Sequence, residues 1–359
     1  MNLVAFIDSP LQALNLLEYS KRFSREVDVV VVGDVAEPES CSQIEAVLSL
    51  LGPKQIIQRE WMLRPAGPHR AQRSVASGVA ALRSHLPPGP HEFIVGEYRS
   101  AFSWAVLHRL KDLARNVVVV DDGTAMLRID RQKSIPRSRE QWRLQLKRLI
   151  FLALGIRGIV PRSDLTFFTS FAINDRVAPG DTVIRNDYRT LSSELRELPP
   201  DEDSVYVIGG PYLEGGDVDQ GDVELALELI GFAADYTGKE VIYMAHRRER
   251  AEKLNVLRRE VTVVTPDVPF EIYPRVIGRR PRFIVGYYSS VFVTAAELLG
   301  NAVDIIALEM PRHQINSSWL PFIDAVYEYY RTELPTAIRI VDRPNSFRDE
   351  KGRSGQDSS

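Results

Sequence analysis

The sequence is poor in cysteine, in unbalanced charge and in long apolar runs. Cys41 is its one cysteine among 359 residues, which excludes an internal disulfide and a cysteine-rich zinc site and favours a reducing cytoplasm. The 45 Lys and Arg residues against 48 Asp and Glu residues leave a net charge of −3, so nothing global points to a nucleic-acid partner. No apolar run reaches the roughly 18 residues that a membrane-spanning helix needs.

The common phosphate-binding motifs are missing as well. There is no GxGxxG segment and no Walker loop, which argues against a dinucleotide-dependent dehydrogenase and a P-loop enzyme. The histidines lack the spacing of metal ligands, and the Asp217-Val218-Asp219 segment is better explained as an acidic turn before a helix. We therefore expect neither a metal ion nor a resident cofactor.

Short runs rich in Val and Ile alternate with helical patterns along most of the chain. In the first half, strands of this kind are expected at 3–7, 27–32, 92–95 and 117–120. The alternation restarts at 204–208 and continues to 303–308. Apolar strands bounded by turns are typical of parallel sheets that helices cover on both faces. The sequence predicts an α/β, GT-B-like fold, with two facing Rossmann-like domains and a cleft between them.

Composition divides the chain into two domains and a tail. Residues 1–195 are expected to form an acceptor domain and 196–344 a donor domain, and the linker between them is placed in the Glu-, Pro- and Asp-rich stretch 191–203. Residues 345–359 are polar and rich in serine and glycine, which predicts a disordered tail.

A basic segment at 131–162 departs from the rest of the chain. Nine Lys and Arg residues against the single acid Glu140 give it a charge of +8, and aliphatic residues are interleaved. One interpretation is an amphipathic helix that binds an anionic membrane surface. The other is a helix that closes the domain and turns a solvated basic face outward.

Four polar groups follow predicted strands, at the ends where open α/β sheets bind their ligands. The first domain has Ser9–Gln12 and Asp121–Gly123, and the second has His246–Glu249 and Tyr287–Ser290. A cleft between the domains would bring all four together.

The acidic pair is a candidate for general base catalysis. Asp121 and Asp122 point in different directions after a valine strand, so one carboxylate can face the cleft while the other fixes the loop. The plain alternative is a turn, because Asp122-Gly123 is a strong turn dipeptide.

His246 and Arg247 form a candidate phosphate site. A cationic cluster at a strand end suits an anion, and a histidine there can protonate a leaving phosphate. The hydroxyls of Ser289 and Ser290, at the start of a predicted helix, can hold the same anion. The alternatives are a solvated surface cluster and a capping role alone.

The ordered set resembles the bacterial sialyltransferases and polysialyltransferases of the GT-B type, namely glycosyltransferase family 52 and its polysialyltransferase relatives. That group has a Ser/Thr-Pro-Leu-Gln-like turn, an acidic pair before glycine, a His-Pro motif, a Pro-x-Glu element and paired hydroxyls. The corresponding segments here are Ser9–Gln12, Asp121–Gly123, His246-Arg247, Pro269–Glu271 and Ser289-Ser290. Arg247 stands where the family has proline.

The resemblance implies an inverting, metal-independent transfer of sialic acid, or of a related nonulosonic acid, from a CMP-sugar donor. The acceptor would be a hydroxyl of a glycan or glycolipid in surface polysaccharide or lipooligosaccharide synthesis. Asp121 would be the general base, with Asp122 and Gly123 supporting the loop. The CMP phosphate would be held by His246, Arg247, Ser289 and Ser290, the nucleotide by Gly210 and Glu271, and the acceptor side of the cleft by Ser9 and Gln12.

Three alternatives stay open. The donor is another CMP-sugar, such as a Kdo donor; or the chain is a UDP-sugar epimerase or transferase of the GT-B type; or it is a catalytically silent scaffold of a polysaccharide assembly complex. An enzyme of this kind would act in the cytoplasm, and segment 131–162 would hold it at the inner face of the plasma membrane.

Overall fold

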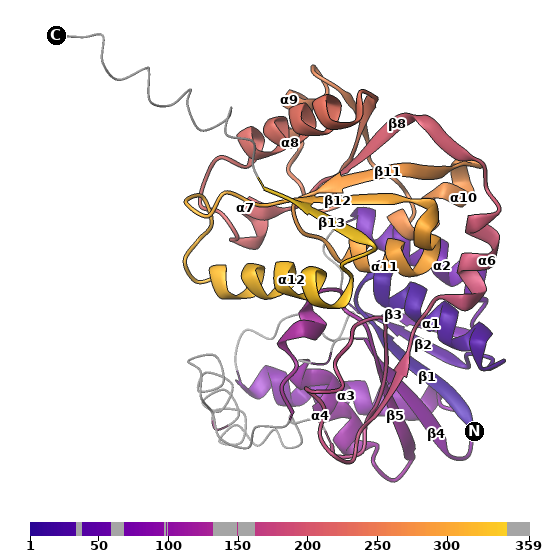
Figure 1. Ribbon diagram of the computed structural model, residues 1–359. Coiled ribbons are helices and arrows are strands. Elements are labelled where there is room, and N and C mark those ends of the chain that lie inside the picture. The colour runs from indigo at the N-terminus through magenta and orange to yellow at the C-terminus, as the bar shows by residue number, and fades with distance from the viewer. Residues whose placement is uncertain are drawn as a thin grey trace. The chain divides into compact units, whose positions relative to one another are not determined.

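Buried, valine-rich strands organise the chain into two parallel sheets (Figure 1). The computed structural model describes residues 1–33, 38–58, 68–96, 98, 100–131, 149 and 162–342. Unit 1 comprises Met1–Glu194 with Asp267–Pro269, and unit 2 comprises Leu195–Pro266 with Phe270–Ser359.

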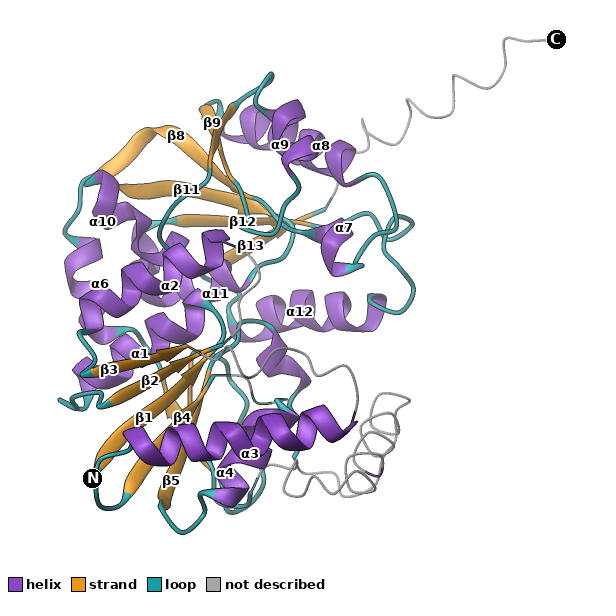
Figure 2. Ribbon diagram, turned by 180° about the vertical axis from the view of Figure 1, so that it is seen from behind, coloured by secondary structure: helices purple, strands orange, loops and turns teal. Residues whose placement is uncertain are grey.

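Unit 1 contains a seven-stranded sheet in the order β3-β2-β1-β4-β5-β6-β7. Its strands are β1 (Asn2–Ile7), β2 (Val29–Val32), β3 (Gln55–Gln58), β4 (His91–Val95), β5 (Ala114–Val120), β6 (Thr166–Thr169) and β7 (Thr182–Arg185). Its helices are α1 (Pro10–Arg22), α2 (Pro38–Leu51), α3 (Pro68–His85), α4 (Ala101–Arg109), the 3₁₀ helix η2 (Ala125–Arg128) and α6 (Arg189–Arg196). Helices α3 and α4 lie on one face of the sheet, and α1 and α2 on the other (Figure 2).

Unit 2 contains a six-stranded sheet in the order β10-β9-β8-β11-β12-β13. Its strands are β8 (Pro200–Ile208), β9 (Glu240–Met244), β10 (Thr262–Val264), β11 (Arg280–Gly286), β12 (Asp304–Leu308) and β13 (Ile338–Val341). The α-helices are α7 (Tyr212–Gly215), α8 (Asp222–Thr237), α9 (Ala251–Leu257), α10 (Tyr273–Ile277), α11 (Ser290–Leu299) and α12 (Leu320–Glu333). The 3₁₀ helices are η3 (Phe270–Ile272) and η4 (Gly300–Ala302). Helices α8 and α9 cover one face, and α11 and α12 cover the other (Figure 1).

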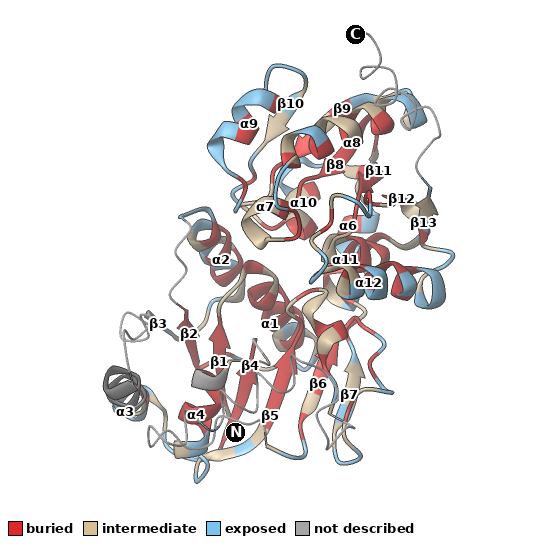
Figure 3. Cartoon of the chain, turned by 90° about the vertical axis from the view of Figure 1, so that its left-hand side faces the viewer, coloured by how far each residue is buried: buried red, intermediate tan, exposed pale blue. Residues whose placement is uncertain are grey.

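The apolar strands are buried because helices pack on both of their faces (Figure 3). In unit 1, Val4 of β1 pairs in register with Val29 of β2, and both are buried. In each sheet the strand order reverses beside the first strand, between β1 and β4 and between β8 and β11. Doubly wound sheets bind ligands at such switch points, beyond the carboxyl ends of the strands.

The boundary between the units falls between Glu194 and Leu195, inside the stretch 191–203 that was predicted as the linker, although regular structure occupies most of that stretch. The helix α6 covers its start, with Leu191 and Leu195 buried, and β8 begins at Pro200. The acidic residues of this stretch also take part in regular structure, since Asp201 accepts a hydrogen bond from the Tyr206 hydroxyl at 2.7 Å within β8.

Most of the basic segment 131–162 lies outside the described residues, as does the tail 345–359, so membrane binding and disorder stay predictions. Arg131, at its start, donates to both carboxylate oxygens of Asp181 at 2.5 and 2.9 Å. That side chain is 10% exposed, so it belongs to the packing of unit 1 rather than to a solvated basic face. In the described part of the chain, no helix combines the length and the apolar character needed to cross a bilayer.

Acid is expected to destabilise unit 1 through His91. This residue begins β4, is 1% exposed and stacks on Phe93, with 5.8 Å between ring centroids. Burial lowers the pKa of His91 below its ordinary value of about 6.5, so the unfolded chain takes up the proton first. The stabilisation from neutral His91 is present above that value and is lost as the pH falls toward the lowered pKa, with a slope of up to about 1.4 kcal/mol per pH unit.

Urea unfolding at several pH values between 7.5 and 5 measures this effect. His91→Phe keeps a buried ring and is expected to flatten the acid limb, whereas His108→Phe, at an exposed position on α4, is the matched control. An unchanged limb in His91→Phe would assign the acid sensitivity to other groups.

Candidate functional site

Two of the four predicted polar groups and a glycine turn lie at the carboxyl edge of the unit 2 sheet. Strand β8 lies between β9 and β11. The turn Gly209-Gly210 follows β8, His246 follows β9 shortly after Met244, and Ser289 and Ser290 follow β11. The topology therefore gathers these groups at the switch point of unit 2.

The start of α11 offers donors to an anion. Ser289 is the N-cap, and its hydroxyl oxygen accepts from the Val291 N–H at 3.2 Å. The Ser289 N–H donates to the Tyr330 hydroxyl, and the Phe292 N–H donates to the Ser289 carbonyl. Among the described residues the Ser290 N–H has no hydrogen-bond partner, and Ser290 is half-buried. That N–H and the two serine hydroxyls remain to bind a ligand at the positive end of the helix.

The surroundings of His246 favour a neutral ring. Its Nδ1 atom faces the Arg248 N–H at 3.1 Å, and because that group can only donate, Nδ1 accepts and Nε2 carries the proton. Burial keeps the pKa of His246 well below its usual range, and the charges of Arg247, Arg248 and Lys253 act in the same direction. The ring is thus a hydrogen-bond donor through Nε2. The proton transfer from His246 to a leaving phosphate stays a prediction.

Glu271 lies beside the start of α11. Its carboxylate accepts from the Thr294 hydroxyl at 2.9 Å, and the side chain is buried in the 3₁₀ helix η3. Burial raises the pKa of Glu271, while the charge of Arg247 lowers it. Arg247 lowers the pKa of His246 as well, so this half-buried cation acts on both groups.

Gly210, in the turn after β8, packs against a tyrosine of the same chain. A Cβ atom at this position would meet the ring of Tyr212, which packs against the glycine. Both residues are buried, so the glycine makes room for a tyrosine of the same chain. The role of Gly210 in nucleotide binding stays a prediction.

The Asp217-Val218-Asp219 segment forms structural contacts. Asp217 accepts from the Tyr288 hydroxyl at 2.5 Å, and Asp219 accepts from the Asn316 side chain at 3.2 Å. Within the described ranges, no group of three or more His, Cys, Asp or Glu side chains is placed to hold a metal ion. The expectations of a metal-free site and of no cofactor stay predictions.

In unit 1, Gln12 and Asp122 form a fixed pair at the carboxyl edge. The Gln12 amide nitrogen donates to Asp122 Oδ1 at 2.8 Å, and its amide oxygen accepts from the Asp8 N–H at 2.7 Å. Ser9 caps α1 by accepting from the Gln12 N–H at 3.3 Å, and its hydroxyl lies 3.4 Å from Asp122 Oδ1. A Cβ atom at Gly96 would collide with the Gln12 side chain, so the absence of a side chain at Gly96, after β4, leaves room for the Gln12 amide.

The two aspartates differ in burial and in their contacts, and their predicted roles stay predictions. Asp121 is fully buried, and its Oδ2 atom accepts from the Ser170 N–H at 2.8 Å. Its carbonyl oxygen accepts from the Asn15 side chain at 3.2 Å. Asp122 is half-buried, so it is the carboxylate that a substrate can reach. Gly123 follows at a φ of +66°, a conformation that favours glycine, and shapes the turn.

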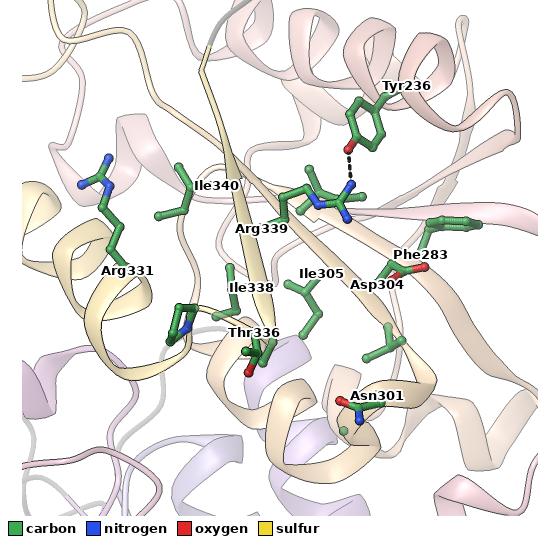
Figure 4. A pocket seen from close by; sticks show the side chains of 15 residues that line it. Tyr236, Phe283, Asn301, Asp304, Ile305, Arg331, Thr336, Ile338, Arg339 and Ile340 are labelled. Carbon is green, nitrogen blue, oxygen red and sulfur yellow. Dashed lines mark hydrogen bonds between the residues drawn. The ribbon is translucent and has the colours of Figure 1, made fainter.

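One cavity in the described part of unit 2 lies away from His246, Ser289 and Ser290. It has a volume of about 610 Å³ and opens at the amino-terminal ends of β12 and β13, where Arg339 donates to the Tyr236 hydroxyl at 2.9 Å (Figure 4). Parallel sheets carry their ligands at the carboxyl edge, where His246 and Ser290 follow their strands. We therefore place the site of unit 2 at that edge. The predicted cleft between the two units stays a prediction.

Comparison with known proteins identifies the architecture. No family model matches the chain, and neither does any curated protein. Among solved structures, UDP-GlcNAc 2-epimerase from Methanocaldococcus jannaschii, in complex with UDP-GlcNAc and UDP, matches with a TM-score of 0.51 and 14% identity over 95% of this chain and 89% of that one. The Neisseria meningitidis UDP-GlcNAc 2-epimerase bound to UDP-GlcNAc matches with a TM-score of 0.50 and 12% identity over 98% and 90%. The fold is GT-B-like.

The GT-B-like fold agrees with the sequence prediction, but the predicted family does not. The similar structures are UDP-GlcNAc 2-epimerases, so membership of the sialyltransferases and polysialyltransferases is wrong, as is its link to CMP-sialic acid and to capsule or lipooligosaccharide synthesis. The family prediction failed because its motifs are not specific: Ser-Pro, Asp-Gly and Ser-Ser also form the helix caps and turns that any doubly wound sheet has at its carboxyl edge. At these identities the likeness concerns the fold alone.

Proposed function

We propose that the chain is a UDP-sugar enzyme, in which unit 2 binds the nucleotide and unit 1 supplies a general base. The observation that carries the proposal is the set of groups at the switch point of unit 2. His246 offers Nε2–H, Ser290 offers an N–H at a helix start, and Glu271 offers a buried acceptor next to it. The binding of UDP-GlcNAc by the two similar epimerases supports a uridine nucleotide.

The donors suit a diphosphate and the acceptor suits a ribose. The Ser290 N–H, the hydroxyls of Ser289 and Ser290, His246 and Arg247 can share the negative charge of two phosphates, and no proton has to move to the leaving group. The Glu271 carboxylate can accept from a ribose hydroxyl while Thr294 holds its other side.

The reaction we propose is glycosyl transfer to a hydroxyl. Asp122 takes the proton of the acceptor hydroxyl, whose oxygen forms a bond to the anomeric carbon of the sugar. The bond from that carbon to the phosphate oxygen breaks, and its electron pair leaves with UDP. Gln12 orients Asp122 through its 2.8 Å hydrogen bond.

Epimerisation of the UDP-sugar is the second candidate, because both similar structures are 2-epimerases and align along nearly the whole chain. The products separate the two reactions. An epimerase converts UDP-GlcNAc to a second UDP-sugar without any acceptor, whereas a transferase releases UDP in proportion to the acceptor consumed.

Thermal unfolding with UDP, CMP and ADP tests the nucleotide assignment. UDP at 100 times its Kd is expected to stabilise the protein by about 2.7 kcal/mol. Glu271→Gln keeps an acceptor for Thr294 but loses the charge, and it is expected to reduce the UDP effect. Glu240→Gln, at the exposed amino-terminal end of β9, is the matched control. Stabilisation by CMP alone would reject the uridine nucleotide, and no effect of any nucleotide would favour a scaffold protein.

A further inference from the structure

A buried ammonium lies behind the proposed nucleotide site. Lys253 on α9 has a side chain that is 3% exposed. Its Nζ atom lies 2.6 Å from Glu249 Oε1 and 3.7 Å from Asp222 Oδ2, and it donates to the Gly210 carbonyl at 3.2 Å. The same ammonium lies 5.7 Å from the centre of the Tyr212 ring. One side chain thus joins the turn after β8, the start of α8 and the turn after β9.

The carboxylate of Glu249 extends this connection to His246. Its Oε2 atom accepts from the His246 N–H at 2.6 Å, and its Oε1 atom accepts from the Tyr243 hydroxyl at 2.7 Å. The Glu249 side chain is fully buried. A Cβ atom at Gly209 would approach Met244 O to 2.9 Å and would collide with the Glu249 carboxylate, so the two turns pack without spare room.

Stability alone is a poor explanation for this arrangement. Burial raises the pKa of Glu249, and the charge of Lys253 acts against that rise. Taking two charges out of water is costly, and apolar side chains of similar size are often as stable at such positions. Geometry distinguishes the pair from an apolar contact, because the ion pair directs hydrogen bonds to the two turns that flank the proposed site.

We infer that Lys253 is a positioning residue for nucleotide binding, and this inference rests on the proposed function. Lys253 holds the Gly209-Gly210 turn and the His246 turn in one arrangement, so that the His246 ring is presented at the switch point. Lys253 is buried and acts through Glu249 and Gly210 rather than on the nucleotide itself.

Calorimetric titration with UDP tests the inference in the full chain. Lys253→Met is expected to raise the Kd for UDP by about 10-fold or more, the scale on which supporting partners of ligand-binding side chains act. Lys253→Arg keeps the charge and is expected to recover part of the affinity. Arg259→Met removes an exposed cation just after α9 and serves as the matched control. Exchange of the His246 amide proton, followed by NMR, is expected to accelerate in Lys253→Met.

A second variant keeps the test decisive if Lys253→Met fails to fold. Tyr243→Phe removes one donor to Glu249 without leaving a buried charge unpaired, and it is expected to weaken UDP binding and speed the same amide exchange. Unchanged UDP affinity in a folded Lys253→Met or, failing that, in Tyr243→Phe would overturn the inference. A wild-type chain that binds no UDP would instead overturn the proposed function.

Discussion

Asp122→Asn is expected to lower turnover by about 10²- to 10⁴-fold while leaving the free energy of unfolding nearly unchanged. Asparagine has the shape of aspartate and keeps an oxygen that can accept from Gln12, so the loop should retain its structure. It cannot take a proton from an acceptor hydroxyl. Release of UDP from UDP-GlcNAc in the presence of glycan acceptors measures the rate, and urea unfolding measures the stability.

Asp121→Asn is the matched control, with the opposite expectation. The Asp121 carboxylate is fully buried, and one of its oxygens accepts from the Ser170 N–H. Asparagine can keep that hydrogen bond through its oxygen, but its NH₂ group replaces the second carboxylate oxygen in the protein interior. We expect a loss of about 1–3 kcal/mol of stability, with turnover per folded molecule largely retained. An inactive but stable Asp121→Asn beside an active Asp122→Asn would return the role of base to Asp121.

Strands that consist of an uninterrupted apolar run were predictable from the sequence. β12 lies at Asp304–Leu308, inside the predicted strand 303–308, and β5 contains the predicted strand 117–120. Both sit inside a sheet, where an uninterrupted apolar run is the strongest signal. β6 escaped prediction because Thr166–Thr169 is four residues long and has polar ends. Its identity depends on pairing with β5 and β7.

The positions of the candidate residues at the carboxyl ends of strands were predictable, but the orientation of their side chains was not. Asp121 and Asp122 are neighbours in sequence, and the choice between them depends on the N–H of Ser170, which lies 49 positions away. The state of His246 likewise depends on burial within the folded unit. Lys253 was missed, although it stands four residues after Glu249, the last member of the predicted group His246–Glu249, and a search for ion pairs at that spacing would find it.

His246→Ala is expected to lower turnover by about 10²- to 10³-fold, the cost of removing one donor that stabilises charge in a transition state. His246→Gln can place an amide N–H near the position of Nε2 and is expected to retain part of the rate. The glutamine variant is informative because it donates a hydrogen bond but cannot deliver a proton. Equal losses in the two variants would contradict the role of a neutral donor.

The pH dependence of the rate separates the two chemistries further. Burial and the neighbouring cations keep the pKa of His246 well below 6.5, so the ring is already neutral at pH 7. Raising the pH from 6.5 to 8 then removes no proton from it, and we expect no loss of turnover attributable to His246 over that range. A histidine that protonated UDP would lose activity as its imidazolium disappeared. A fall in rate through this range that vanishes in His246→Gln would therefore show proton donation and restore the acid role predicted from the sequence.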